Sequence, residues 1–179
     1  MPLGPKKLLS LVKKKKLVEG LSGRELTNPE GAGFDLRVGE VYKIKGKGYL
    51  GIDERKTPDA LLVKKYKNGT KASITLKPGD YYLVKTIESV NLPENIGATL
   101  FTRGTLFRSG IIHGLSQIAP GYKGELITSL ANLGPCSVEI ELGSRFMHIQ
   151  FVYVEGGGSL YRGQWQGGRV AATKRERQV

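Results

Sequence analysis

The sequence is poor in the side chains from which proteins build cross-links and metal sites. It contains one cysteine, Cys136, and two histidines, His113 and His148. A single cysteine excludes an intramolecular disulfide, and neither histidine has a neighbour at the spacing of metal ligands. We interpret Cys136 as a structural thiol rather than a catalytic one, since no base partner can be placed beside it.

Long apolar runs and the common nucleotide-binding signatures are also missing. No apolar run approaches the roughly 18 residues that a membrane helix needs, and the N-terminus lacks the pattern of a secretion signal. We therefore expect a cytoplasmic protein with no membrane partner. The absence of a Walker loop, a Rossmann fingerprint, a Gly-x-Ser-x-Gly elbow and a kinase signature disfavours the common nucleotide folds.

Acidic residues are in deficit, with 28 Lys and Arg against 16 Asp and Glu and a formal charge of +12. Such an excess favours phosphate-rich partners. Much of it lies in three runs, which are 13–16, 64–71 and 174–177. These runs fit either a solvated surface or a nucleic-acid footprint. Because aromatics are few and no nucleic-acid-binding motif is present, nucleic acid is the less favoured partner.

The periodicity predicts one helix followed by many short strands. Leu8, Leu9, Leu11, Val12 and Leu17 indicate an amphipathic helix over residues 6–18. Alternating or apolar stretches bounded by Gly and Pro predict strands over residues 33–39, 81–86, 98–102, 124–132, 137–142 and 145–153. This rhythm is typical of a β-barrel or a β-sandwich. We expect one domain over residues 1–155 and a flexible C-terminal lid or tail over residues 156–179, after a Gly-Gly-Gly-Ser hinge.

Three segments have a composition suited to binding a nucleotide. The loop 102–110 combines arginines, hydroxyls and glycines, and fits either a phosphate cradle or a solvated turn. Tyr122 follows a Pro-Gly turn, where it can stack on a sugar or simply pack. The segment 161–169 is basic, with two aromatics, and fits either a closing lid or a disordered tail.

Four segments, in order, resemble the successive motifs of the dUTPase and dCTP deaminase superfamily. They are residues 31–37, 103–110, 120–132 and 143–151. The N-terminal helix and the ending 161–167 resemble those of archaeal-type dUTPases and dCTP deaminases, so the resemblance covers residues 8–167. It implies a mainly β fold, a distorted β-barrel called a β-clip, with a short N-terminal helix. It also implies a homotrimer whose active sites lie between subunits and are covered by the C-terminal tail.

The resemblance further implies a pyrimidine deoxynucleoside triphosphate as ligand, with Mg²⁺ held mainly by the triphosphate and no metal ligands from the protein. Carried over by motif, the nucleotide-binding residues fall into four groups. They are Arg103, Gly104, Thr105 and Arg108 in the phosphate loop, Tyr122 on the deoxyribose, Ser129 on the base-facing strand, and Arg162 and Gln166 in the tail.

The sequence departs from the family pattern where the chemistry is expected. The Asp that orients water in dUTPases is replaced by Ala119, and the Glu that moves protons in dCTP deaminases is replaced by Ser129. Neither side chain can act as a general base. The catalytic residues are therefore unknown, with Asp35 and Glu125 as weak candidates. Glu125 is separated from Ser129 by roughly 13 Å along the strand.

Two smaller departures concern the phosphate loop and the fourth motif. Gly104 stands where the family's loop has its first hydroxyl, and His148 stands where a Gln is common. Ser129 and Asn132 are more similar to the dUTPase branch. We expect a dUTP nucleotidohydrolase that releases dUMP and pyrophosphate. The alternatives are a dCTP deaminase and a catalytically impaired nucleotide-binding protein of the same fold.

Overall fold

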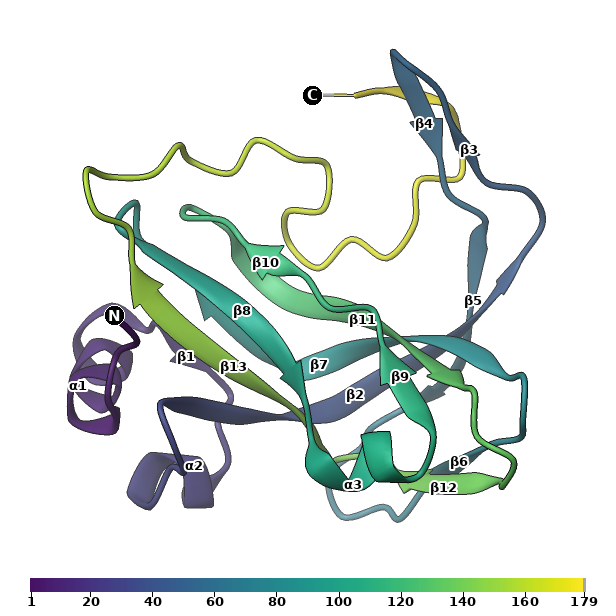
Figure 1. The fold of residues 1–179 in the computed structure, drawn as a ribbon, viewed down its shortest axis with the longest axis horizontal. Helices are drawn as coiled ribbons and strands as arrows, with labels where there is room; N and C mark the ends of the chain where they lie inside the picture. The colour runs from purple at the N-terminus through teal and green to yellow at the C-terminus, as the bar shows by residue number, and fades with distance from the viewer. Residues whose placement is uncertain (179) are drawn as a thin grey trace.

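A computed structural model describes residues 1–178 and is dominated by one curved antiparallel sheet (Figure 1). The hydrogen-bonded strand order is β10-β8-β13-β2-β7-β11-β9, with β1 on β7 and β5 on β2 as branches. These strands are β1 (Val18–Glu19), β2 (Gly33–Lys45), β5 (Asp59–Lys65), β7 (Tyr81–Asn91), β8 (Ile96–Thr102), β9 (Ile111–His113), β10 (Gln117–Ile118), β11 (Lys123–Asn132) and β13 (Arg145–Tyr153). The expectation of a mainly β fold is confirmed.

The sheet curls into a distorted, incomplete barrel because its central strands are bent. Register shifts occur between Val38 and Glu40 in β2 and between Glu125 and Ile127 in β11. Such bulges bend a strand and increase its twist. Strand β2 is buried along most of its length, and Phe34, Leu36, Val38 and Val41 form part of the core. The strand has 13 residues, of which the last four, from Tyr42 to Lys45, are partly or fully exposed.

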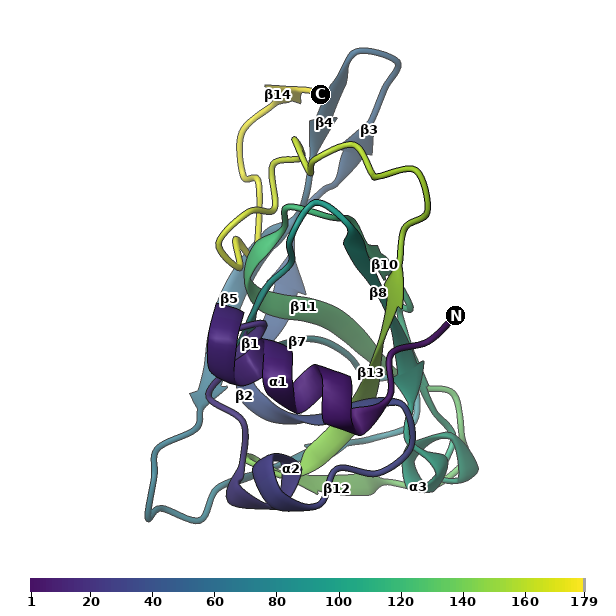
Figure 2. The ribbon, with the colours of Figure 1, turned by 90° about the vertical axis from the view of Figure 1, so that its left-hand side faces the viewer.

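Two small sheets extend the barrel at its ends. Strands β6 (Ser73–Leu76) and β12 (Val138–Glu141) pair near α3. Strands β3 (Tyr49–Leu50) and β4 (Glu54–Lys56) form an arm that projects from the body, and β14 (Glu176–Arg177) joins its edge (Figure 2). Glu176 and Arg177 therefore pair with residues more than a hundred positions earlier, Arg55 and Glu54.

The N-terminal helix α1 (Pro5–Lys15) covers the side of the sheet that carries β1 and β2 (Figure 2). Its Pro5 suits a first helical turn, and lysines in the last turn complement the helix dipole. The helix ends at Lys15 rather than at residue 18, because Lys16 adopts a left-handed conformation with φ 52°. Leu17 and Val18 are consequently freed to enter the core, where Val18 begins β1.

Two short helices were not expected from the sequence pattern. Helix α2 (Gly23–Thr27) is capped by Ser22, whose hydroxyl accepts a hydrogen bond from the Glu25 N–H at 3.5 Å. Helix α3 (Gly104–Arg108) forms inside the loop 102–110. Each has five residues, too few for an apolar periodicity to be recognised in the sequence.

The segment after β13 lies along the turn between β10 and β11 (Figure 1). Backbone hydrogen bonds join Tyr161 to Pro120 at 2.7 Å and Gly167 to Lys123 at 2.8 Å. Its role as a flexible lid stays a prediction, as does the division at residue 155. No helix among residues 1–178 is both long enough and apolar enough to cross a membrane.

Candidate functional site

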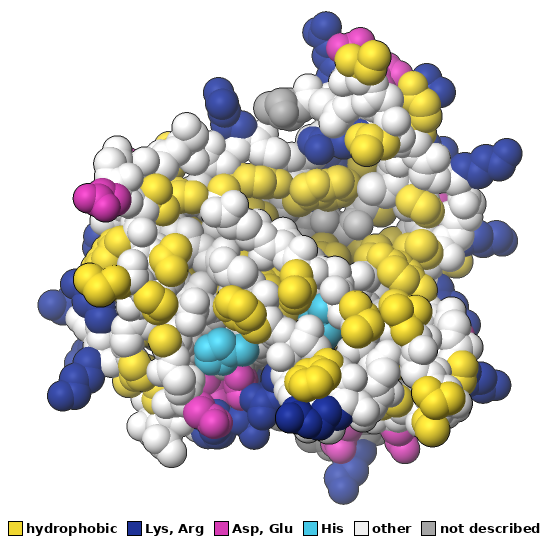
Figure 3. All heavy atoms as spheres, viewed as in Figure 1, with side chains coloured by type: hydrophobic (Ala, Val, Ile, Leu, Met, Phe, Trp, Pro, Cys, Tyr) yellow, Lys and Arg dark blue, Asp and Glu magenta, His cyan; other side chains and the backbone are white. Residues whose placement is uncertain are grey.

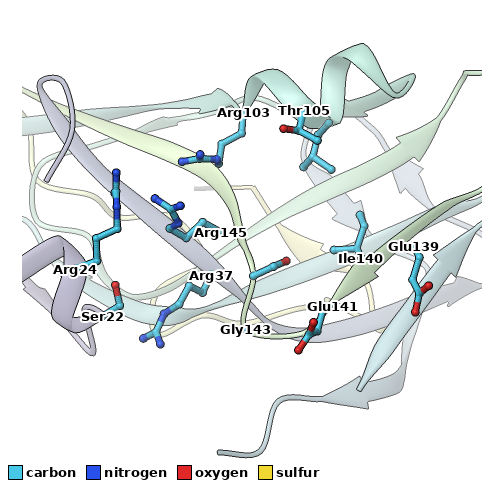
Figure 4. Close-up of a pocket in the computed structure, with 12 residues that line it drawn as sticks. Ser22, Arg24, Arg37, Arg103, Thr105, Glu139, Ile140, Glu141, Gly143 and Arg145 are labelled. Carbon is cyan, nitrogen blue, oxygen red and sulfur yellow. The ribbon is translucent and has the colours of Figure 1, made fainter. Parts of the chain in front are cut away.

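A cavity with a volume of about 680 Å³ opens between α2, the start of α3 and the turn from β12 to β13. Arginines dominate its lining, and they converge from four segments that are distant in the sequence (Figure 4). The charged and hydroxyl-bearing lining residues are Ser22, Arg24, Arg37, Arg103, Thr105, Glu139, Glu141, Ser144 and Arg145. Such a concentration of guanidinium groups suits a polyanion.

Asp35 contacts three of these arginines and holds them in position. Its buried carboxylate contacts the Arg103 guanidinium directly, and its Oδ2 lies 3.1 Å from Arg145 Nη1 and 3.8 Å from Arg24 Nη1. A second buried carboxylate, that of Glu25, accepts the Asp35 N–H at 3.0 Å and contacts Arg24 Nη1 at 2.5 Å. Buried carboxylates require such partners, and the partners are thereby fixed in position.

Arg37 is fixed separately by Glu88, whose side chain is completely buried. The carboxylate of Glu88 accepts hydrogen bonds from the Arg37 N–H at 2.8 Å and from Nε at 2.6 Å. The Arg37 Nη2 group donates to the Gly20 carbonyl at 2.5 Å. Burial raises the pKa of Glu88, and its hydrogen bonds from Arg37 oppose this effect. These hydrogen bonds fix the guanidinium of Arg37 in one position at the cavity wall.

The arginines around the cavity repel one another. Burial, followed by the charge of Arg145, lowers the pKa of Arg103 from its usual value. A guanidinium stays protonated at neutral pH in any case. The lowered pKa of Arg103 therefore indicates that its charge is disfavoured by burial and by Arg145, not that the charge is lost. An anion entering the cavity would relieve this repulsion. The arginine side of the cavity therefore suits an anion.

The phosphate loop predicted from the sequence is divided by the structure. Arg103 and Thr105 line the cavity, whereas Arg108 turns back along α3. Its Nη1 donates to the Gly104 carbonyl at 3.2 Å, and its guanidinium lies 4.7 Å from the Phe107 ring centre. Arg108 is thus not positioned on the cavity wall.

Tyr122, Arg162 and Gln166 gather at the opposite end of the barrel, at the turn between β10 and β11 (Figures 1 and 2). Tyr122 is buried, its hydroxyl donates to the Glu125 carbonyl at 2.7 Å, and its ring contacts Tyr161 edge-on at 5.2 Å. Burial raises the pKa of Tyr122 to about 12. Gln166 accepts from the Lys123 N–H at 3.0 Å and donates to the Gly121 carbonyl at 3.2 Å. Arg162 is exposed beside them.

Ser129 has a structural hydrogen bond in this chain. Its side chain points outward from β11, and Oγ accepts the Gly114 N–H at 3.0 Å. The neighbouring Thr128 hydroxyl donates to the Gly114 carbonyl at 2.6 Å. Glu125 lies against the tail, where a Cβ on Gly168 would come within 2.6 Å of its carboxylate. Neither residue lines the arginine cavity.

Sequence reasoning missed several functional candidates. Arg24 and Arg37 lie before or within the first motif, and Arg145 lies in the fourth motif, but none was assigned a role. His148 does not line the cavity, but it contacts the carboxylate that anchors the arginines, with Nδ1 at 3.0 Å from Asp35 Oδ1. The capping pattern of Ser22 and Glu25 could have located α2. No local sequence pattern predicts that Arg24 and Arg103 line the same cavity.

The cavity offers few side chains that could coordinate a metal ion. Among residues 1–178 there is no group of three or more His, Cys, Asp or Glu side chains that could hold one. Glu139 and Glu141 are the carboxylates that line the cavity, opposite the arginines (Figure 4). Glu139 already accepts the Ser73 hydroxyl at 2.5 Å. The residues fit a magnesium ion only as one that arrives already bound to phosphate oxygens.

Comparisons with known proteins agree on one family. The family model of dCTP deaminase-like proteins matches residues 3–154. A dCTP deaminase of Thermococcus kodakarensis is 33% identical over 168 residues, covering 93% of this chain and 96% of the relative. A probable deoxyuridine 5'-triphosphate nucleotidohydrolase of Methanothermobacter thermautotrophicus is 32% identical over 142 residues, covering 79% and 89%.

A solved structure extends the agreement to the fold. The 2'-deoxycytidine 5'-triphosphate deaminase of Agrobacterium tumefaciens superposes with a TM-score of 0.64 at 17% identity, over 84% of this chain. This chain spans 46% of the length of that protein. At such identity the likeness concerns the fold alone. The relatives carry two different activities, so similarity does not select one of them.

Proposed function

Because the chain belongs to the dCTP deaminase-like family, we propose that it hydrolyses dUTP to dUMP and pyrophosphate. The observation that carries the proposal is the arginine cavity combined with the identity of Ser129. The cavity offers guanidinium groups from Arg24, Arg103 and Arg145, which suit a triphosphate. Ser129 offers no carboxylate to the base. The site is thus equipped for phosphate and poorly equipped for deamination.

Deamination of dCTP requires a group that moves protons between water and the cytosine ring. The position expected for it is Ser129, whose Oγ is hydrogen bonded to the Gly114 N–H. A neutral serine hydroxyl is too weak a base to take up a proton from water at neutral pH. This argument favours hydrolysis over deamination. It leaves nucleotide binding without turnover as the alternative, since Ala119 also lacks a carboxylate.

We assign the triphosphate to the arginine cavity. Arg103, Arg145 and Arg24 would hold its phosphate oxygens, and Thr105 would add a hydroxyl donor. Bound Mg²⁺ would supply neutralisation of the triphosphate charge. Asp35 and Glu25 keep the arginines in place before the ligand arrives, so little reorganisation accompanies binding.

We further propose that the complete site forms between copies of this chain in a homotrimer. In one chain the arginine cavity and the Tyr122 turn lie at opposite ends of the barrel. Large apolar side chains are exposed in or beside β8, α3, β9 and β11; they are Phe101, Phe107, Ile112, Leu115 and Leu133. Figure 3 shows apolar side chains exposed on the face that carries α3 and β9. An exposed apolar set of this kind is typical of a subunit interface. Light scattering during gel filtration tests the assembly, and a monomer would contradict it.

The activity is tested with purified protein and each of the deoxynucleoside triphosphates in the presence of Mg²⁺. We expect pyrophosphate release from dUTP and no ammonia release from dCTP. Ammonia release from dCTP would establish the deaminase instead. Tight nucleotide binding in calorimetry, without turnover of any nucleotide, would establish the binding protein.

Arg103→Ala is the variant that links this activity to the cavity. We expect dUTP affinity to fall about 100-fold, because charge-assisted hydrogen bonds contribute roughly 1.5–3 kcal/mol each. Arg175→Ala is the matched control, since Arg175 lies on the Tyr49 ring in the arm. Equal effects of the two substitutions would remove the cavity from the proposal.

A further inference from the structure

His148 lies on β13 directly opposite Asp35 of β2 in the antiparallel register. Its Nδ1 is 3.0 Å from Asp35 Oδ1, and its side chain is 24% exposed. The other oxygen of Asp35 contacts Arg103 and Arg145, two arginines of the cavity. One buried carboxylate therefore joins a histidine to the groups that would hold phosphate.

This arrangement fixes the tautomer of His148. A carboxylate held by two guanidinium groups accepts hydrogen bonds, so Nδ1 of the ring is the nitrogen that carries the proton. Nε2 is then left with a free lone pair. On the neighbouring strand, a Cβ at Gly33 would come within 2.5 Å of Nε2. A Cβ there would also overlap the backbone carbonyl of Ile149, so both the close approach of β13 and the position of the His148 ring require glycine at residue 33.

His148 can act as a general base, a group that the rest of the site lacks. Ala119 and Ser129 replace the carboxylates that activate water in the two branches of the family. Asp35 is itself saturated by three partners and cannot take up a further proton without losing them. A neutral imidazole oriented by a carboxylate is a general base of the kind used in hydrolases.

We propose that His148 is the catalytic base of this chain, with Asp35 as its positioning residue. The inference rests on the proposed function. Water gives a proton to Nε2 while its oxygen forms a bond to the α-phosphorus of bound dUTP. The bond from that phosphorus to the bridging oxygen of the β-phosphate breaks, and the electron pair leaves with pyrophosphate. The imidazolium is stabilised by Asp35 and returns its proton to solvent.

The surroundings of His148 keep it neutral at physiological pH. Charged groups face it from four segments: Asp35 on β2, Glu25 and Glu30 at and after α2, Arg103 after β8, and Arg145 on its own strand. Burial is the largest influence and lowers its pKa, Glu25 raises it, and Arg103 lowers it. A base must be deprotonated to act, so activity should be lost only on the acid side of its ordinary value of 6.5.

The test compares His148→Gln and His148→Ala with the wild-type chain and with Gln150→Ala, a control two residues further along β13. Affinity for a non-hydrolysable dUTP analogue is measured by calorimetry, and kcat by pyrophosphate release. We expect kcat of His148→Gln to fall by about 10²- to 10⁴-fold, while the analogue binds within about threefold of wild type. Added imidazole should restore part of the rate of His148→Ala. The acid limb of the wild-type pH profile should be absent from the residual activity of His148→Gln.

A His148→Gln variant that keeps kcat within tenfold of wild type would overturn the inference. Should the variants fail to fold, diethyl pyrocarbonate is applied to the wild-type chain, since His113 is buried and His148 is the partly exposed histidine. Modification of His148 that leaves the rate unchanged overturns it, and inactivation prevented by the analogue supports it. If the wild-type chain itself hydrolyses no nucleotide, the proposed function fails first, and this inference fails with it.

Discussion

The arginine cavity and the Tyr122 turn differ in how many of their polar groups are already hydrogen bonded within the chain. In the cavity, Arg24, Arg37, Arg103 and Arg145 stand over three buried carboxylates, and the guanidinium groups still have donors facing open space. At the Tyr122 turn, the Tyr122 hydroxyl and the Gln166 amide are hydrogen bonded to the backbone. The first region has unused hydrogen-bond donors, whereas the polar groups of the second are already paired, partly within β11 and partly with the tail.

This difference indicates which region can accept a ligand without rearrangement. The cavity is open as it stands, and its guanidinium groups suit an anion. The Tyr122 turn can meet a sugar only if the tail moves or if a neighbouring subunit supplies the contact. Substitutions can test whether the arginine cavity is open and the Tyr122 turn is closed. They are described from the largest to the smallest expected change in the free energy of unfolding.

The largest effect concerns the charge cluster beside the Tyr122 turn, where Glu40 and Glu125 line a small cavity. Burial raises the pKa of Glu40, but hydrogen bonds from Lys65, Tyr42 and Lys85 outweigh it and bring the pKa down to about 2. A carboxyl group with a lowered folded-state pKa contributes stability above its unfolded value of 4.5. That stability is lost as the pH falls from 4.5 towards 2.

Glu40→Gln should therefore lower the free energy of unfolding by up to roughly 3 kcal/mol at pH 7. The difference from wild type should shrink as the pH falls through this window. Urea unfolding of both proteins at pH 7, 4.5 and 3 measures it. A constant difference across these pH values would mean that the cluster is not held by ionised Glu40.

Gly124→Ala should open the closed region. Gly124 has φ 133°, and a Cβ there would meet the Gly167 Cα at 2.6 Å. Because both the backbone strain and the contact with the tail are unfavourable, we expect a loss of about 2 kcal/mol and release of residues 156–178. Limited proteolysis should then cut the tail faster than in wild type, and Gly156→Ala, with no atom near its Cβ position, provides the control.

Tyr122→Phe should have a moderate effect. It removes the hydrogen bond from the hydroxyl to the Glu125 carbonyl and leaves the ring contact with Tyr161 in place. We expect thermal unfolding to report a loss of about 1 kcal/mol. Nucleotide affinity should change little if the turn is closed by the tail. A strong loss of affinity would show that Tyr122 meets the ligand after the tail has moved.

Gly104→Ser should have the smallest effect on stability. The new Cβ would approach Arg108 Nη1 at 2.7 Å, which is the end of a flexible and exposed side chain that can move aside. We expect a change in unfolding free energy within about 0.5 kcal/mol. The added hydroxyl beside Arg103 and Thr105 should raise dUTP affinity a few-fold in calorimetry. An unchanged affinity would place this part of the loop outside the phosphate site.

Sequence reasoning located some parts of the site and not others for identifiable reasons. Arg103 and Thr105 were found because they lie in one short segment with a recognisable composition. Arg108, in the same segment, turns away because α3 directs its guanidinium back to Gly104 and Phe107. Composition reports which groups are available but does not report the direction in which a side chain points.

The sequence by itself determined the mainly β fold and the N-terminal helix, since these depend on periodicity and on local motifs. The tertiary structure alone decided that Arg24, Arg37 and Arg145 join Arg103, and that Asp35 contacts His148. These residues are brought together by the antiparallel pairing of β2 with β13 and by the packing of α2. Contacts between segments more than a hundred residues apart leave no trace in local sequence patterns, because they form only when the sheet closes.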